Sequence, residues 1–212
     1  MRMTHLALSS LLLIPAVAAA QPAPTTVTAT TEPAAKTWTV GVAPRVGLVA
    51  PTSKLGLMVI GGVQLDVATP ALDHRLLIGI DASLTRPSHD GTVMDPRLPG
   101  MADYTIHETE MVVALLATLR LAGPEKPLVP WVAAGPMLHM LRTTETTTIA
   151  PGDNTEVSTE PGVEVAGGAD FAAGPGYLGG DLRAAYSKLD HSLTGNTNAG
   201  KVAVTLSYRF VF

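Results

Sequence analysis

The chain has 212 residues, a net charge of −4, 15% charged residues, 46% hydrophobic residues and no cysteine. Its mild acidity excludes the concentrated basic surface that nucleic-acid binding needs, and the lack of cysteine excludes disulfides and thiolate metal sites. After the first twenty residues, no segment offers the ~18 uninterrupted apolar residues of a membrane helix. If such a chain enters a membrane, it must do so as a closed barrel, because lipid cannot satisfy free backbone groups.

The first 37 residues have the pattern of an export signal followed by a linker. Residues 1–20 combine a basic start at Arg2, a short apolar stretch and an Ala18-Ala19-Ala20 cleavage site, which predicts a secretory signal peptide. Residues 21–37 form a Pro/Thr/Ala-rich tract that cannot bury enough apolar surface to offset chain entropy, so we expect a disordered leader. Residues 38–212 remain, and we interpret them as one domain.

That domain shows a two-residue alternation of apolar and polar side chains, interrupted by Pro and Gly. The pattern predicts an all-β chain with an eight-stranded antiparallel up-and-down barrel. Alternation alone does not show which face of each strand points inward. The expected strands are residues 38–50, 55–68, 74–86, 104–121, 128–142, 162–171, 177–187 and 201–212.

The connections between the expected strands fall into two classes. Short Gly/Pro turns are predicted at residues 69–73, 123–127 and 172–176, and they alternate with longer polar loops at 87–103, 143–161 and 188–200. Short periplasmic turns and long extracellular loops are typical of transmembrane barrels. The connection at 51–54 departs from this pattern because it is short.

Three segments carry a resemblance to a known family. The chain ends on a two-faced strand with Tyr208, Phe210 and Phe212, residues 130–135 (PWVAAG) form a Pro-aromatic-x-x-x-Gly start, and residues 163–171 (VEVAGGADF) are Gly-rich. In their order along the chain, these segments resemble those of the small eight-stranded outer-membrane barrels, the group of the OmpA transmembrane domain, OmpX and opacity-type proteins. The resemblance implies a place in the outer membrane of a Gram-negative cell, in contact with lipid and lipopolysaccharide. It also implies that Tyr208, Phe210 and Phe212 form the signal that the barrel-assembly machinery reads.

The polar faces of these strands carry the main candidate site. Inside an eight-stranded barrel the lumen is filled by side chains, so we expect a charge-paired structural plug rather than an open pore. An ion or proton path is the alternative interpretation. The expected lumen charges are Arg45, Asp66, Asp81, Glu108, Glu110, Arg120, Glu164, Asp170, Asp181, Arg183 and Arg209.

Other motifs indicate no chemistry. Residues 174–179 (GPGYLG) match G-x-G-x-x-G, but the next residues alternate like a strand and not like the helix that a dinucleotide site requires. The scattered histidines lack ligand spacing, and the acids Glu145, Asp153, Glu156 and Glu160 lack the close alternation of a calcium loop. We therefore predict no cofactor and no metal.

We expect a non-enzymatic, porin-like barrel with a structural or surface-interaction role. One alternative is a lipid-modifying hydrolase similar to the outer-membrane lipid A deacylases, with His191 as base, Ser192 as nucleophile and Asp190 as the third member; adjacent residues on an extended chain point to opposite faces, which gives this pair poor geometry. Another alternative is a soluble periplasmic barrel that carries an apolar ligand, like the lipocalins.

Overall fold

The computed structural model describes residues 39–52, 56–94, 101–147, 153–189 and 199–212. The signal peptide, the leader and Trp38 lie outside the described residues, as does the Asp190-His191-Ser192 segment.

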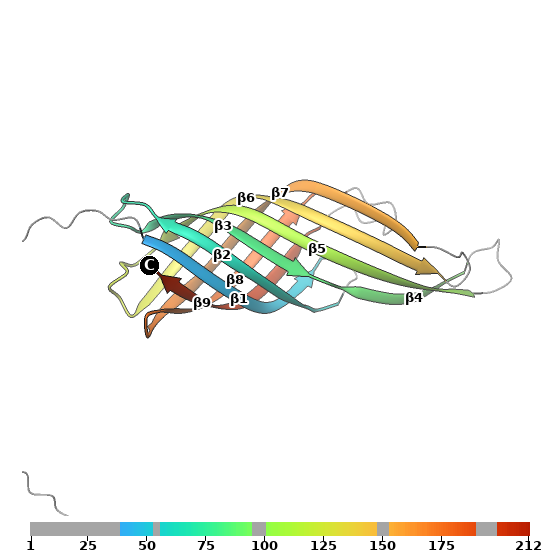
Figure 1. The fold of residues 1–212 in the computed structure, drawn as a ribbon, viewed down its shortest axis with the longest axis horizontal. Coiled ribbons are helices and arrows are strands. Elements are labelled where there is room, and N and C mark those ends of the chain that lie inside the picture. Colours follow the sequence, from blue (N-terminus) through green and yellow to red (C-terminus); the bar gives the residue numbers. More distant parts are fainter. Residues whose placement is uncertain (1–38, 53–55, 95–100, 148–152, 190–198) are drawn as a thin grey trace, which may run out of the picture. The chain divides into compact units, whose positions relative to one another are not determined.

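The described chain forms one antiparallel sheet that closes into a barrel (Figure 1). Apart from β3 and β4, consecutive strands pair with one another; β1 pairs with β9, and β3 pairs with β5 to close an eight-stranded ring. The short strand β4 stands outside the ring and pairs with the first part of β5. The predicted fold class is confirmed. The strands are β1 Thr39–Pro51, β2 Met58–Ala68, β3 Leu76–Thr85, β4 Ser88–Met94, β5 Met101–Arg120, β6 Leu128–Thr147, β7 Asp153–Ala173, β8 Gly176–Ser187 and β9 Lys201–Val211.

The two faces of the barrel wall differ in polarity. On β5, Leu115 is 53% exposed on the outside, whereas its neighbours Ala114 and Leu116 are buried inside. Many outward residues of the other strands are also large and apolar, as at Leu206, which is 63% exposed. The buried, inward positions instead include many charged residues, as at Arg45 and Asp81. The structure thus settles what alternation could not: the apolar face is outside. In the described ranges, no helix is long and apolar enough to cross a membrane.

Two of the predicted loops are strands wherever the structure describes their residues. The expected loop at residues 143–161 instead extends β6 and β7, which pair as far as Thr146 and Asp153. The expected loop at 87–103 contains β4 and the start of β5. These predictions were wrong because the extensions are rich in polar residues and lack a continuous apolar face, although the β-branched threonines of the β6 and β7 extensions favour extended chain. Threonines also pair across strands, as Thr144 Oγ1 and Thr155 Oγ1 do at 3.3 Å.

The opposite rim carries the tight turns. Gly174 and Pro175 join β7 to β8, and Gly174 has φ +59°, which suits the first central position of a type II′ turn. Between β2 and β3, the backbone passes through the left-handed region at Leu72, Asp73 and His74. The Arg120 N–H at the end of β5 donates to the Arg75 carbonyl at 2.8 Å, which fixes this turn beside β5.

Candidate functional site

The eleven charged residues that the sequence singled out all occupy inward positions, but they do not form one network. They separate along the barrel into three groups. The central group is Arg45, Asp81, Glu164, Asp181 and Arg183; the rim group, next to the tight turns, is Asp66, Arg120, Asp170 and Arg209; the outer group, toward the strand extensions, is Glu108 and Glu110.

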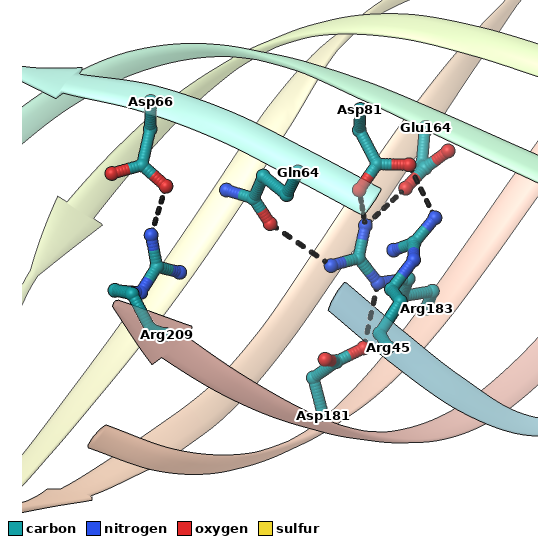
Figure 2. A network of polar contacts seen from close by, with 8 residues as sticks. All are labelled: Arg45, Gln64, Asp66, Asp81, Glu164, Asp181, Arg183 and Arg209. Atoms are coloured by element: carbon teal, nitrogen blue, oxygen red, sulfur yellow. Dashed lines mark hydrogen bonds and ion pairs between the residues drawn. The ribbon is translucent and has the colours of Figure 1, made fainter. Parts of the chain in front are cut away.

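Arg183 on β8 is the hub of the central group (Figure 2). Its Nε donates to Asp181 Oδ1 at 2.6 Å, and its Nη1 donates to Asp81 Oδ2 at 3.0 Å and to Glu164 Oε1 at 2.9 Å. Its Nη2 donates to Gln64 Oε1 at 3.2 Å. One planar guanidinium therefore ties together β2, β3, β7 and β8, using the several fixed donors that distinguish arginine from lysine.

Arg45 on β1 completes the group through its contact with Asp81, whose two carboxylate oxygens thus serve two arginines. Space for the Arg45 side chain comes from Gly62 on the neighbouring strand β2, where a Cβ would lie 2.8 Å from Arg45 Nε. The group holds two cations and three carboxylates in a buried volume. Charges buried in this way persist only when they are paired and hydrogen-bonded, so the group acts as a cross-brace between strands.

Of the two arginines in the rim group, one forms ion pairs with both aspartates and the other with neither. Arg209 on β9 forms ion pairs with Asp66 and, from Nε at 3.3 Å, with Asp170 Oδ2. Asp170 Oδ1 also accepts a hydrogen bond from Trp131 Nε1 at 3.2 Å. Arg120 forms no side-chain hydrogen bond or ion pair within the described part of the chain, and its Cζ lies 5.8 Å from the centre of the Tyr177 ring.

In the outer group, Glu110 is fully engaged and Glu108 is not. Glu110 Oε1 lies 2.5 Å from His139 Nε2 and accepts from Lys201 Nζ at 2.8 Å, while its Oε2 accepts from Thr85 Oγ1 at 2.8 Å. Glu108 is buried, and its Oε1 has no hydrogen-bond partner among the described residues.

Five of these partners were missed at the sequence level: Gln64, Thr85, Trp131, His139 and Lys201. His139 was judged by metal-ligand spacing and Trp131 by its motif. Strand parity, the alternation of inward and outward residues along a strand, could have identified them. His139 shares the inward face of β6 with Trp131 and Met137. Lys201 opens β9 on the same face as Arg209.

Apolar side chains separate the central and outer groups. They form two clusters, one around Val49, Ile60 and Ala203 and the other around Val112 and Met137. The cavity beside Arg45, Ser83 and Lys201 has a volume of only about 20 Å³, which is room for about one water molecule. This cavity therefore has no room for a solute much larger than water.

The other motifs noted in the sequence lie in turns and strands of the barrel. Residues 174–179 form the β7–β8 turn and the start of β8, with no helix after them. Glu145, Glu156 and Glu160 lie on the β6 and β7 extensions. The part of the chain that the structure describes contains no group of three or more potential metal-ligating acids or histidines.

The fold and its interior define a class of protein: a small eight-stranded antiparallel β-barrel with a charged interior and an apolar outer surface. Its architecture confirms, at the level of the fold, the resemblance to the small outer-membrane barrels. No family model and no curated protein matches the chain.

Similar solved structures are distant. The chain is 12% identical to the N-terminal barrel of Pseudomonas aeruginosa OprF (TM-score 0.43, covering 82% of this chain and 97% of that one). It is 14% identical to a major outer membrane protein of Thermus thermophilus (TM-score 0.42, 82% and 99%) and 13% identical to the Yersinia pestis attachment invasion locus protein Ail (TM-score 0.38, 82% and 97%). Matches at this level carry no conclusion about activity.

Proposed function

We propose that this protein is an integral protein of the bacterial outer membrane with a structural or surface-interaction role and no open pore. The observation that carries the proposal is the polarity of the wall, with apolar side chains outside and charges inside. Along β5 and the residue that follows it, the outward apolar side chains run from Met111 to Leu121, roughly 33 Å along the chain, or about 25 Å along the axis of a barrel with tilted strands. That height matches the apolar band of an outer-membrane barrel.

The same observation disfavours a soluble, lipocalin-like carrier. Such a barrel would need an apolar interior for its ligand and a polar exterior for water. Here the interior holds the central group and the exterior holds exposed Leu, Val and Phe side chains. The hydrolase alternative rests on Asp190, His191 and Ser192, which lie outside the described residues, and no observation favours it.

The strand extensions support a surface role. β5, β6 and β7 have 20, 20 and 21 residues, about twice the length that a tilted strand needs to cross the apolar core. Beyond the last outward apolar residue of β6, Met140, the outward positions are Arg142, Thr144 and Thr146. The extensions therefore continue as a polar sheet with β4 outside the apolar band, which could present a rigid surface to partners.

Three exposed cations lie just beyond the apolar band and fit lipopolysaccharide as a neighbour. Arg86, Arg142 and Lys188 each follow the last outward apolar residue of their strand by two positions, after Leu84, Met140 and Tyr186. Cations at that height would meet lipid phosphate groups, which bind arginine through charge-assisted hydrogen bonds. Lipopolysaccharide added to the detergent-solubilised protein should raise its unfolding temperature, and Arg86→Gln with Arg142→Gln should reduce that rise. The matched control is Arg75→Gln at the opposite rim.

Fractionation and migration test the membrane proposal directly. The mature protein should sediment with outer membranes, need detergent for release, and migrate differently before and after boiling, because an intact barrel resists unfolding in detergent. Release into the periplasm without detergent would overturn the proposal. Liposomes that contain the folded protein should show no more sucrose influx than empty liposomes, since the cavity beside Arg45, Ser83 and Lys201 has no room for sucrose.

A further inference from the structure

A cavity of about 280 Å³ lies at the rim that carries the tight turns. Its polar lining includes Arg120, His74 and Asp66, and its apolar lining includes Ala68, Leu77 and Val211. Ligand sites are commonly mostly apolar hollows with a few fixed polar groups, and this volume is near the lower limit of such sites. The cavity has room for a small molecule.

Arg120 is the charged residue of the cavity lining that has no direct ion pair, although Asp66 and Asp170 attract it at longer range. Its residue surface is 9% exposed, and its side chain forms no ion pair or hydrogen bond with the described residues. Its guanidinium lies over Tyr177, whose hydroxyl donates to the Pro124 carbonyl at 3.0 Å and so fixes the ring. No guanidinium nitrogen of Arg120 is among the buried side-chain atoms without a partner, so its donors face the open cavity and are available to a polar occupant.

The nearby carboxylates do not supply that partner. Asp66 is paired with Arg209, and Asp170 is paired with Arg209 and Trp131. The Nδ1 atom of His74, which also lines the cavity, is buried and likewise has no partner among the described residues. The cavity lining therefore combines one arginine without an ion pair and one histidine nitrogen without a partner, and its aspartate Asp66 already pairs with Arg209.

We propose that this cavity binds a small aliphatic carboxylate. The guanidinium of Arg120 donates to both carboxylate oxygens in the bidentate geometry that arginine favours, and the short apolar body packs against Ala68, Leu77 and Val211. This site depends only on the barrel interior. It goes beyond the proposed surface role and can fail while that role stands.

The test is a titration of the full-length mature protein, extracted in detergent, with propionate at pH 7. We expect a saturable NMR response with a dissociation constant in the millimolar range, and intermolecular NOEs from the propionate methyl group to the Tyr177 ring and Leu77 methyl groups. Arg120→Gln should weaken binding about tenfold or more, since a hydrogen bond to a charged group is lost. Arg75→Gln removes an exposed arginine of the same rim and should bind like the parent.

Ala68→Leu fills the cavity without changing its charge, so it should also abolish binding, and it replaces Arg120→Gln if that variant does not fold. A linear response, an equal response to chloride, or unchanged binding by the cavity-filling variant overturns the proposal. Saturable binding of phosphate without binding of propionate overturns the assignment of a carboxylate. The NOEs in the parent protein require no variant, and their absence at propionate saturation counts against the site.

Discussion

Arg183 and Asp81 lie 102 positions apart in the chain, and Arg183 Nη1 donates to Asp81 Oδ2 over 3.0 Å inside the barrel. The contact joins β8 to β3, which are not neighbours in the sheet. Hydrogen bonds of the ladder connect adjacent strands only, so this ion pair is a brace across the lumen. It makes the stability of the closed barrel depend on the central group.

Loss of Arg183 should therefore be strongly destabilising. Arg183→Met leaves Asp81, Glu164 and Asp181 with Arg45 as the one arginine of the central group, and breaking a buried pair from one side typically costs about 3–5 kcal/mol. Urea unfolding of the protein in lipid vesicles measures the loss. Arg75→Gln, at an exposed position, should change the free energy of unfolding by less than about 0.5 kcal/mol.

A double variant distinguishes the effect of losing the positive charge of Arg183 from the effect of losing its packing. Adding Asp181→Asn to Arg183→Met removes one of the uncompensated carboxylates and should recover part of the lost free energy of unfolding. If the double variant is as unstable as the sum of the two single variants, the charges are independent and the cross-brace interpretation is wrong.

If the apolar band lies in a membrane, the loss of stability caused by an outward arginine should depend on its depth in the band. Leu115→Arg puts a charge at the middle of the band on β5, where arginine costs about 2–4 kcal/mol in a transmembrane barrel. His107→Arg puts the same side chain on the outward face of the same strand, beyond Met111, and should cost about 0–1 kcal/mol. The comparison uses unfolding in vesicles, and equal costs at the two positions would argue against a membrane around β5.

Much of the fold could be predicted from the sequence because the period of two and the Gly/Pro turns are local signals. The last strand was expected at residues 201–212 and spans Lys201–Val211. β7 was expected to begin at residue 162, where its apolar alternation begins, but its threonine-rich first part starts at Asp153. Alternation of apolar residues detects a strand only where one face meets an apolar medium, so the extensions gave no such signal.

The candidate site was less predictable, because strand parity gives the face of a residue but not its level along the barrel. Parity places Asp66 and Asp81 on the same inner surface, yet the register assigns Asp66 to the rim group and Asp81 to the central group. That separation depends on the offset between strands, which no local pattern encodes. Arg120 shows the same limit, because only the three-dimensional geometry reveals that it forms no ion pair within the described residues.

Glu108 should make the free energy of unfolding depend on pH. It lies beyond Met111, outside the apolar band, and burial together with the nearby charge of Glu110 raises its pKa from 4.5 to about 7. The folded protein thus holds this proton more tightly than the unfolded chain does. The stabilisation is fully present below about pH 4.5 and is lost as the pH rises through about 7.

Glu108→Gln should remove this component. The free energy of unfolding of the parent should fall more steeply between about pH 5 and about pH 8.5 than that of the variant, and the difference should be measurable by urea titration at several pH values. Glu125→Gln, at an exposed turn position, should follow the parent. Parallel curves for the parent and Glu108→Gln would show that Glu108 is ionised in the folded protein throughout this range.

Gly135, the last residue of the PWVAAG segment, has a packing role that can be tested. A Cβ at this position would lie 1.8 Å from the Leu115 carbonyl oxygen on β5, closer than any real contact. Gly135→Ala must displace backbone, so it should destabilise the barrel by about 1–3 kcal/mol or more. At Gly61, an added Cβ meets nothing within 4 Å, so Gly61→Ala should be close to neutral in the same unfolding assay.

The C-terminal aromatic residue should matter for assembly more than for stability. Phe212 is 78% exposed, and its backbone N–H donates to the Val40 carbonyl at 2.9 Å, a bond that alanine would keep. Phe212→Ala should therefore refold in detergent with nearly the parent's free energy of unfolding. In cells, we expect less of it in the outer membrane if the assembly machinery reads the terminal ring.

The matched control for that experiment is Phe171→Ala. Phe171 is also an exposed, outward aromatic residue near the rim with the tight turns, but it lies within β7 and away from the chain end. If the only effect is the loss of an aromatic ring at the membrane interface, the cellular yields of both variants should fall equally. A reduced yield for Phe212→Ala alone, with both variants refolding normally in vitro, would show that the terminal position acts through recognition, because the two changes remove the same side chain from similar surroundings.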